Sequence, residues 1–414
     1  MQTNLAPEFK GTRQGEQAEA ILRKCVHCGF CTATCPTYQL LGDELDGPRG
    51  RIYLMKQVLE GAPVTRSTQL HLDRCLTCRN CESTCPSGVE YGHLVDIGRK
   101  IVEDRVERPS GEKAVRWLLK EGLTSPLFGP AMKVGQALRP LLPASLKAKV
   151  PGRSPPRANQ WPTREHPRKV LMLLGCVQPA MMPNINSATA RVLDAAGIQT
   201  LVADGAGCCG ALRTHLNDID GGLQDMRRNV DAWWPLVEGL TSAGKVEAIV
   251  MNASGCGVTV KDYGHALAHD ADYAERAARI SALTRDLSEL LPELVGPLKK
   301  KLHPLTLRRL AFHPPCTLQH GQQLRGGVEK HLGELGFEVS LAAGESHLCC
   351  GSAGTYSVLQ PELATQLRDR KLGQLAPLQA EAIVSANIGC IQHLQSGTEL
   401  PVRHWIEVLD DAMA

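Results

Sequence analysis

Two cysteine motifs constrain this chain more than any other feature. Residues 25–36 are CVHCGFCTATCP and residues 75–86 are CLTCRNCESTCP. Both follow the pattern C-x2-C-x2-C-x3-C-P, in which the fourth cysteine comes one residue late and precedes a proline. Three closely spaced thiols on a tight loop can converge on one small volume, which is what a thiolate-bound metal group requires. Each motif therefore predicts a loop that folds around a bound group.

The spacing favours a 4Fe-4S cluster at each motif. In two-cluster ferredoxins with this pattern, the fourth cysteine ligates the other cluster. Structural zinc usually takes two close pairs of ligands separated by a longer gap, and buried structural cysteines would be scattered. We therefore expect crossed ligand sets: Cys25, Cys28, Cys31 and Cys85 for cluster I, and Cys75, Cys78, Cys81 and Cys35 for cluster II.

Helical periodicity surrounds both motifs. Apolar residues recur at helical spacing over 15–24, 47–61 and 91–107. We expect an α-helical ferredoxin domain over residues 1–108. Arg49 and Arg51 either hydrogen-bond cluster sulfurs, pair with acidic neighbours, or stand at a solvated helix start.

The chain has 16 cysteines in 414 residues. It has no long apolar run and a polar N-terminus without a signal-peptide pattern, which predicts a cytosolic protein. Disulfides are disfavoured there, so dense thiols indicate metal or redox chemistry. A net charge of +3 is too small to indicate a nucleic-acid partner. Beyond the motifs, the cysteines form two further sets: Cys176, Cys208, Cys209 and Cys256, then Cys316, Cys349, Cys350 and Cys390.

A basic linker is expected over residues 109–168. Residues 105–169 carry 14 Lys/Arg and 4 Asp/Glu. Short helices are predicted over 114–123 and 129–150, followed by an extended segment over 151–169. A basic amphipathic segment can lie on an anionic membrane surface; the alternative is a solvated connector packed against a partner subunit.

The remainder is an internal duplication. VEAIVMNASGC, ending at Cys256, resembles AEAIVSANIGC, ending at Cys390, and each half contains a Cys-Cys-Gly loop. Alternating strands and helices predict two α/β lobes with mainly parallel sheets, residues 169–300 and 301–414. Strands are expected over 169–176, 198–204, 246–256, 307–316, 337–343 and 380–390, and helices over 185–196, 222–240, 328–335 and 361–375.

The lobe cysteines predict shared metal centres at strand ends, where α/β proteins bind ligands. Thr259 and His393 occupy the places where a C-x2-C pair would end. We expect a further cluster in at least one lobe, with Cys316, Cys349, Cys350 and Cys390 as the better candidate set; zinc-filled or empty lobes are the alternatives. Nearby His313, His320 and His347 either tune such a cluster, bind a quinone or are hydrogen-bonded loop residues.

These motifs resemble a family of iron–sulfur redox subunits that includes heterodisulfide reductase-type proteins. CVHCGFCTATCPTYQLLGDELDGPRGRIYLMKQVLEG, HLCCGSAGTY and VRHWIE more specifically resemble the iron–sulfur subunits of glycolate oxidase. The resemblance implies eight cluster ligands at the motif cysteines, an FAD-binding partner that oxidises glycolate to glyoxylate, a quinone-linked acceptor, and a place at the inner face of the cytoplasmic membrane. Thr259 and His393 depart from the pattern needed for disulfide cleavage at a five-thiolate cluster.

The resemblance implies that the flavin lies on another chain, and this chain has no P-loop. The fold expected is multidomain α+β, with an α-helical two-cluster ferredoxin domain before two duplicated α/β lobes. The expected function is electron transfer within a flavin-dependent glycolate dehydrogenase. The alternatives are a related 2-hydroxyacid or glycerol-3-phosphate dehydrogenase, a heterodisulfide reductase-like catalytic subunit, and a structural adaptor.

Overall fold

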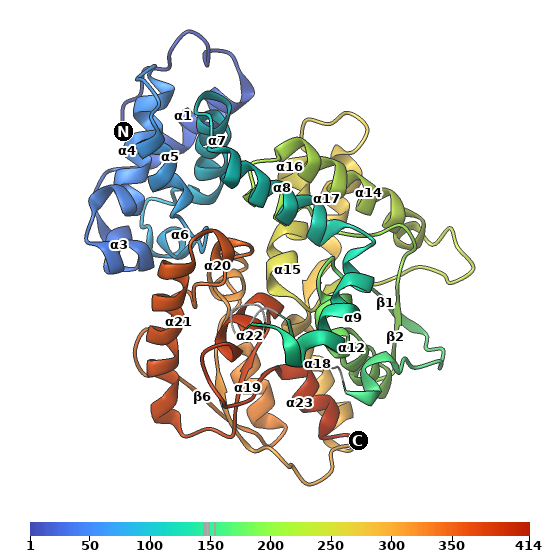
Figure 1. The fold of residues 1–414 in the computed structure, drawn as a ribbon. Helices are drawn as coiled ribbons and strands as arrows, with labels where there is room; N and C mark the ends of the chain where they lie inside the picture. Colours follow the sequence, from blue (N-terminus) through green and yellow to red (C-terminus); the bar gives the residue numbers. More distant parts are fainter. Residues whose placement is uncertain (144–146, 148–149, 153–154) are drawn as a thin grey trace.

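The computed structural model describes residues 1–143, 147, 150–152 and 155–414. A helical part at the N-terminus precedes a helical connector and two α/β lobes. In Figure 1 the blue helical part lies beside the orange and red second lobe, and the teal connector crosses to the green and yellow first lobe. The predicted fold class is confirmed.

The helical part packs its longer helices around one apolar core. Leu22, Met55 and Leu94 are fully buried in this core and come from different helices. The predicted helices over 15–24, 47–61 and 91–107 are confirmed to within a few residues. The longer helices are α1 (Arg13–Lys24), α4 (Pro48–Leu59), α5 (Arg66–Asp73) and α7 (Tyr91–Arg105), and the shorter ones near the motifs are α2 (Phe30–Ala33), α3 (Pro36–Leu41) and α6 (Asn80–Thr84).

Each lobe contains a parallel sheet, and within the described residues both sheets have four strands in the same order. The first sheet runs β2 (Ile198–Leu201), β1 (Arg168–Met172), β3 (Ala248–Met251), β4 (Thr284–Asp286). The second runs β6 (Glu338–Leu341), β5 (Arg309–Phe312), β7 (Ala382–Ser385), β8 (Val402–His404). The pairing of β1 with β3 has the same register as the pairing of β5 with β7, when residues are numbered back from the next cysteine in each lobe. This agreement supports the duplication. Sequence analysis missed β4 and β8 because three residues of mixed polarity form no apolar run.

The two lobes share one hydrophobic core. Val170 and Val192 of the first lobe belong to the same buried cluster as Phe312 and Trp405 of the second. The lobes therefore form one packed body. The predicted helices correspond to α12 (Pro183–Ala195), α14 (Ile219–Glu238), α19 (Gly327–Glu334) and α21 (Pro361–Leu375).

The connector forms α8 (Ser110–Thr124), as expected, and α9 (Phe128–Leu138), which is shorter than the predicted helix over 129–150 because a 3-10 helix, η2 (Arg139–Leu141), follows it. The predicted helix over 129–150 extends onto residues 144–146 and 148–149, which lie outside the described residues. The segment expected to be extended includes a short 3-10 helix, η3 (Pro156–Asn159), before β1 begins.

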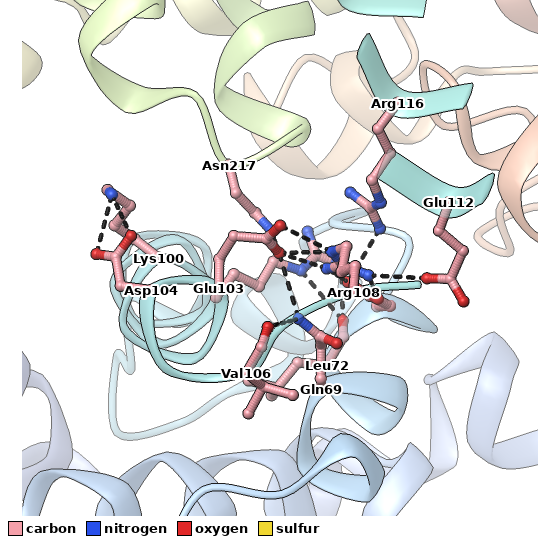
Figure 2. Close-up of polar contacts among 12 residues, drawn as sticks. Gln69, Leu72, Lys100, Glu103, Asp104, Val106, Arg108, Glu112, Arg116 and Asn217 are labelled. Carbon is pink, nitrogen blue, oxygen red and sulfur yellow. Dashed lines mark hydrogen bonds and ion pairs between the residues drawn. The ribbon is translucent and has the colours of Figure 1, made fainter. Parts of the chain in front are cut away.

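An ion-pair network lies where the helical part meets the connector (Figure 2). The Arg108 side chain is only 2% exposed, and its guanidinium lies 2.6 Å from both the Asp73 and the Glu103 carboxylates. Arg116 lies 3.2 Å from Asp73, and Asn217 of the first lobe donates a hydrogen bond to Glu103 at 2.9 Å. This network joins α5, α7, α8 and the first lobe. Arg108, the last residue of the predicted ferredoxin domain, is therefore a buried structural residue.

The rest of the connector exposes apolar side chains. Trp117 is 62% exposed and Leu127 is 74% exposed, and Leu118, Val134 and Leu141 are exposed as well. Among the described residues, no helix has the length and apolar character that crossing a bilayer requires.

Candidate iron-sulfur centres

The two cysteine motifs fold into loops of matching backbone conformation. In both loops the residues on either side of the second cysteine are left-handed: His27 (φ 57°), Gly29 (φ 84°), Thr77 (φ 51°) and Arg79 (φ 59°). A β-branched residue such as Thr77 is an outlier in this region, and backbone strain of this kind concentrates at functional sites. Left-handed residues within a turn create concave rings of N–H groups that bind anions, including iron–sulfur groups. The loop shape therefore suits a bound cluster.

The first sulfur group joins the first motif to the last cysteine of the second. Burial raises the pKa of Cys31 to about 11, and the charges of Cys25, Cys28 and Cys85 add to the rise. Because such interactions weaken with distance, Cys85 must lie among the thiols of the first loop. All four also line one small pocket. They are the residues predicted for cluster I.

The second sulfur group includes Cys35. Burial raises the pKa of both Cys78 and Cys81, and the charges of Cys75 and Cys35 add to both rises. Cys35 is the N-cap of α3, and Pro36 is the first residue of that helix. Proline is well suited to this position because its missing N–H needs no partner there. The structure thus brings the thiols together in the crossed sets; their ligation of clusters stays a prediction.

Both groups have the donor chemistry of a 4Fe-4S cluster. Thiolates are soft ligands that select iron–sulfur clusters among the metal groups of proteins. Burial is the largest cause of the raised pKa values of Cys31, Cys78 and Cys81, and repulsion between the negative sulfurs adds to it. A bound iron core would relieve this repulsion, because its positive charge stabilises the thiolate form.

The two arginines singled out in the sequence pair with carboxylates. Arg49 Nε donates to Glu44 Oε1 at 2.6 Å. Arg51 is 1% exposed and lies 3.4 Å from the Asp46 carboxylate, with a further hydrogen bond to Thr37 Oγ1 at 3.1 Å. The expectation of acidic partners is confirmed, and a solvated helix start is wrong for Arg51.

The third sulfur group lies in the first lobe. Hydrogen bonds from the thiols of Cys176 and Cys209 lower the pKa of Cys208, while hydrogen bonds to Cys208 and Cys256 raise that of Cys209. The four sulfurs are therefore neighbours. Cys256 does not end a strand, as was expected, but lies in the first turn of α15 (Ser254–Lys261). β3 ends at Met251, where its pairing with β4 also ends, and Ser254 N then donates to Ala386 O of the second lobe, so the chain has left the sheet before Cys256.

The fourth sulfur group lies in the second lobe and is fully buried. Cys316 Sγ lies 3.8 Å from Cys349 Sγ. Cys350 contacts Cys349 on one side and Cys390 on the other. Cys390, like its counterpart in the first lobe, was expected at a strand end but lies in the first turn of α22 (Ile388–Gln395).

A glycine in the left-handed conformation follows each cysteine pair. Gly210 has φ 93° and Gly351 has φ 90°. The N–H of each donates to the first sulfur of its pair, Cys208 or Cys349, at 3.4 Å. The Cys-Cys-Gly turn therefore has the same backbone conformation and the same N–H to sulfur hydrogen bond in both lobes.

We expect Gly351→Ala to destabilise the second lobe by about 1–3 kcal/mol, because an L-residue is strained at this φ. The new Cβ would also lie 2.5 Å from Ala364 O. Hydrogen exchange of the β7 amides measures the effect. Gly333→Ala is the control, since its Cβ meets nothing within 4 Å; equal loss of protection in both variants would contradict the role of the turn.

Thr259 and His393, where a C-x2-C pair would end, contact backbone carbonyl groups. Thr259 Oγ1 donates to Gly255 O at 3.1 Å, and His393 Nε2 lies 3.0 Å from Ala364 O. Neither position supplies a fifth thiolate, in keeping with the departure noted in the sequence.

The histidines near the fourth sulfur group differ in their surroundings. His320 Nδ1 lies 2.9 Å from Ser83 Oγ, and its Nε2 lies 2.8 Å from His347 O. His320 is thus hydrogen-bonded through both ring nitrogens, but it lies in a π-helical turn, Thr317–Gly321, rather than in a loop. His313 is 1% exposed, and neither of its ring nitrogens has a hydrogen-bond partner among the described residues. The expectation of a hydrogen-bonded loop histidine is wrong for His313.

A cavity of about 560 Å³ lies between the helical part and both lobes. Cysteines of the second, third and fourth sulfur groups line it: Cys75, Cys78, Cys176, Cys208, Cys209, Cys256, Cys316, Cys349 and Cys390. After burial, the charge of Cys316 is the main cause of the raised pKa of Cys78. The second and fourth groups are therefore neighbours, a relation that no local sequence pattern revealed.

Direct contacts hold the helical part against the second lobe. Asn80 Nδ2 donates to His347 O at 3.3 Å, and Tyr356 Oη donates to Arg74 O at 3.1 Å. Leu76 belongs to an apolar cluster with Cys316, Cys349 and other residues of that lobe. These contacts fix the two neighbouring sulfur groups relative to each other.

Known proteins are similar to both the motif region and the two lobes. A family model described as a 4Fe-4S dicluster domain matches residues 21–89, and one described as a cysteine-rich domain matches residues 170–261 and 310–395. The glycolate oxidase iron-sulfur subunit of Escherichia coli is 55% identical over the whole of this chain and 99% of its own length. The probable glycolate oxidase iron-sulfur subunit of Bacillus subtilis is 30% identical over 92% of this chain and 90% of its own. Lactate utilization protein A of Bacillus velezensis is 23% identical over 58% of this chain and 99% of its own. The chain belongs to the family of glycolate oxidase iron-sulfur subunits.

Proposed function

We propose that this chain is the electron-transfer subunit of a glycolate dehydrogenase. Electrons come from an FAD-binding partner that oxidises glycolate to glyoxylate, and they leave towards a quinone. The observation that carries the proposal is the convergence of eight motif thiols in two groups of four. Bound 4Fe-4S clusters take up and release single electrons.

We assign the first sulfur group to cluster I and the second, including Cys35, to cluster II. The corresponding division of the chain is a two-cluster ferredoxin domain over 1–108, a linker over 109–168, and lobes over 169–300 and 301–414. The fourth sulfur group is the better candidate for a further cluster, because all its cysteines are buried and it borders the second group. The third group is the weaker candidate, since Cys176 and Cys256 are only partly buried.

The residues around the second sulfur group prepare it to hold a negatively charged cluster. Tyr91 Oη donates to Cys75 Sγ at 3.7 Å. The buried Arg99 guanidinium donates to Cys75 O at 2.6 Å, and the buried Arg51 lies on the Cys35 side, hydrogen-bonded to Thr37. Fixed positive charge and donors near sulfur favour the reduced state. The site is thus suited to accept electrons.

Co-purification with the flavoprotein tests the proposal. We expect the co-expressed chains to form a complex in which glycolate bleaches the iron–sulfur absorbance, whereas the isolated chain with glycolate stays oxidised. Lactate and glycerol 3-phosphate serve as comparison substrates, and we expect each to bleach the iron–sulfur absorbance more slowly than glycolate does. A chain that is reduced without any flavin partner, or that cleaves disulfides itself, would contradict the proposal.

We also propose that the complex works at the inner face of the cytoplasmic membrane and uses the connector surface for contact. Exposed Trp117, Leu118 and Leu141 lie on a basic segment with Lys133 exposed among them, a composition typical of interfacial helices. The intact complex should float with anionic vesicles, and Trp117→Ser with Leu118→Ser should reduce flotation. If these changes instead release the flavoprotein, the surface serves the partner subunit and the membrane proposal is wrong.

A further inference from the structure

The second lobe contains a buried imidazole that no part of the proposed electron path has used. His313 follows strand β5 and precedes Cys316 by three residues. Its backbone is fixed at both ends, because His313 N donates to Val384 O at 2.8 Å and Ser385 Oγ donates to His313 O at 2.9 Å. Leaving a buried polar group without a partner costs about 1–3 kcal/mol. Both ring nitrogens of His313 carry this cost, which a ligand bound by the ring would reduce.

The ring lies against the fourth sulfur group. One ring nitrogen of His313 and the sulfurs of Cys350 and Cys390 all lie within 4.8 Å of one another, and all three residues are buried. Two ligands of one tetrahedral metal ion, at bond lengths of about 2.0–2.3 Å, lie about 3.5–3.8 Å apart. Because the three atoms lie within 4.8 Å of one another, small side-chain movements would let them bind one ion.

We propose that His313 is a direct ligand of iron in the second lobe, where it completes a mixed thiolate and imidazole set with Cys316, Cys349, Cys350 and Cys390. This inference rests on the proposed function, since it takes the lobe metal to be part of an iron–sulfur cluster. Imidazole ligands are known on iron–sulfur clusters and raise the reduction potential relative to thiolate.

The assignment makes the two lobes unequal. The residue three positions before Cys176 in the first lobe is Leu173, which is buried in an apolar core. Leucine has no ligand atom, so the first lobe has no counterpart of the His313 imidazole and can supply only its four cysteine thiolates. Lys371 adds to the difference, because its buried ammonium donates to Glu345 O and contacts Ser346 O beside the fourth group. A neutral ligand and a nearby cation together make the second lobe the stronger electron acceptor of the two.

His313→Leu in the intact flavoprotein complex tests the proposal, because leucine is the residue that the first lobe tolerates at this position. The complex is labelled with ¹⁵N-histidine, reduced with dithionite, and measured by pulsed EPR and iron and zinc analysis. We expect a strongly coupled histidine nitrogen in the unaltered complex. His313→Leu should lose this coupling and about four iron atoms per chain, while the signals of the two ferredoxin-type clusters stay.

His393→Gln is the matched control, since His393 lies in the same lobe with its ring against a backbone carbonyl; this variant should keep the coupling. His313→Cys should retain the iron without nitrogen coupling and lower the midpoint potential. Coupling that survives in His313→Leu, coupling that is lost in His393→Gln instead, or zinc in the lobe would overturn the proposal. Failure of glycolate to reduce the ferredoxin-type clusters before dithionite is added would count against the proposed function only, because dithionite reduction still reports on His313.

Discussion

Cys35→Ser should remove cluster II while leaving cluster I in place. Cys35 belongs to the first motif in sequence, but its charge acts on Cys78 and Cys81 of the second. Changes in the outer shell of a metal site already cost about 10–100-fold in affinity or activity, so loss of a ligand should cost at least the upper value. We expect glycolate-dependent quinone reduction by the complex to fall about 100-fold or more, with one EPR signal lost.

Cys31→Ser is the matched comparison, because it removes a thiol of the same motif whose neighbours are Cys25, Cys28 and Cys85. This variant should lose the other EPR signal. If both variants lose the same signal, each motif binds its own cluster and the crossed assignment is wrong.

Asp46→Asn should destabilise the helical part strongly. The Asp46 carboxylate is completely buried and contacts Arg51 at 3.4 Å, Arg74 at 2.8 Å and His71 at 3.1 Å. Breaking a buried ion pair on one side leaves an uncompensated charge and costs about 3–5 kcal/mol. Because Arg51 also holds Thr37 beside Cys35, cluster II should become labile as well. Hydrogen exchange of the α4 and α5 amides measures the loss.

Asp43→Asn provides the control for this change. Asp43 is exposed and accepts a hydrogen bond from Leu45 N at 2.9 Å, a capping role that asparagine fills equally well. Its effect should stay within about 0.5 kcal/mol. Equal protection in the two variants would show that the buried ion pairs contribute nothing to stability.

Local patterns in the sequence predicted most of the elements and the thiol sets. Apolar residues at helical spacing gave α1, α4 and α7, and short apolar runs gave β1, β3, β5 and β7, because these patterns reflect which side chains are buried. The strand ends were less predictable. Cys256 and Cys390 follow apolar runs, yet each strand ends before its cysteine and a helix begins, because the end of a strand depends on pairing with residues far away in the chain.

The placement of the sulfur groups around one cavity could not be predicted from local patterns. Contacts such as Asn80 with His347 and Tyr356 with Arg74 join residues hundreds of positions apart. The same limit applies to His313, whose orphaned ring is visible only once its surroundings are packed. The burial of Arg51 depends likewise on α3 and α5 closing over it.

Iron and sulfide quantitation with EPR, on the anaerobically purified complex after reduction by glycolate, tests the central claim most directly. The account predicts more than about eight iron atoms and eight sulfides per chain, with two ferredoxin-type signals that glycolate generates only when the flavoprotein is present. A content of about four iron atoms, or clusters that glycolate leaves oxidised in the complete complex, would contradict it.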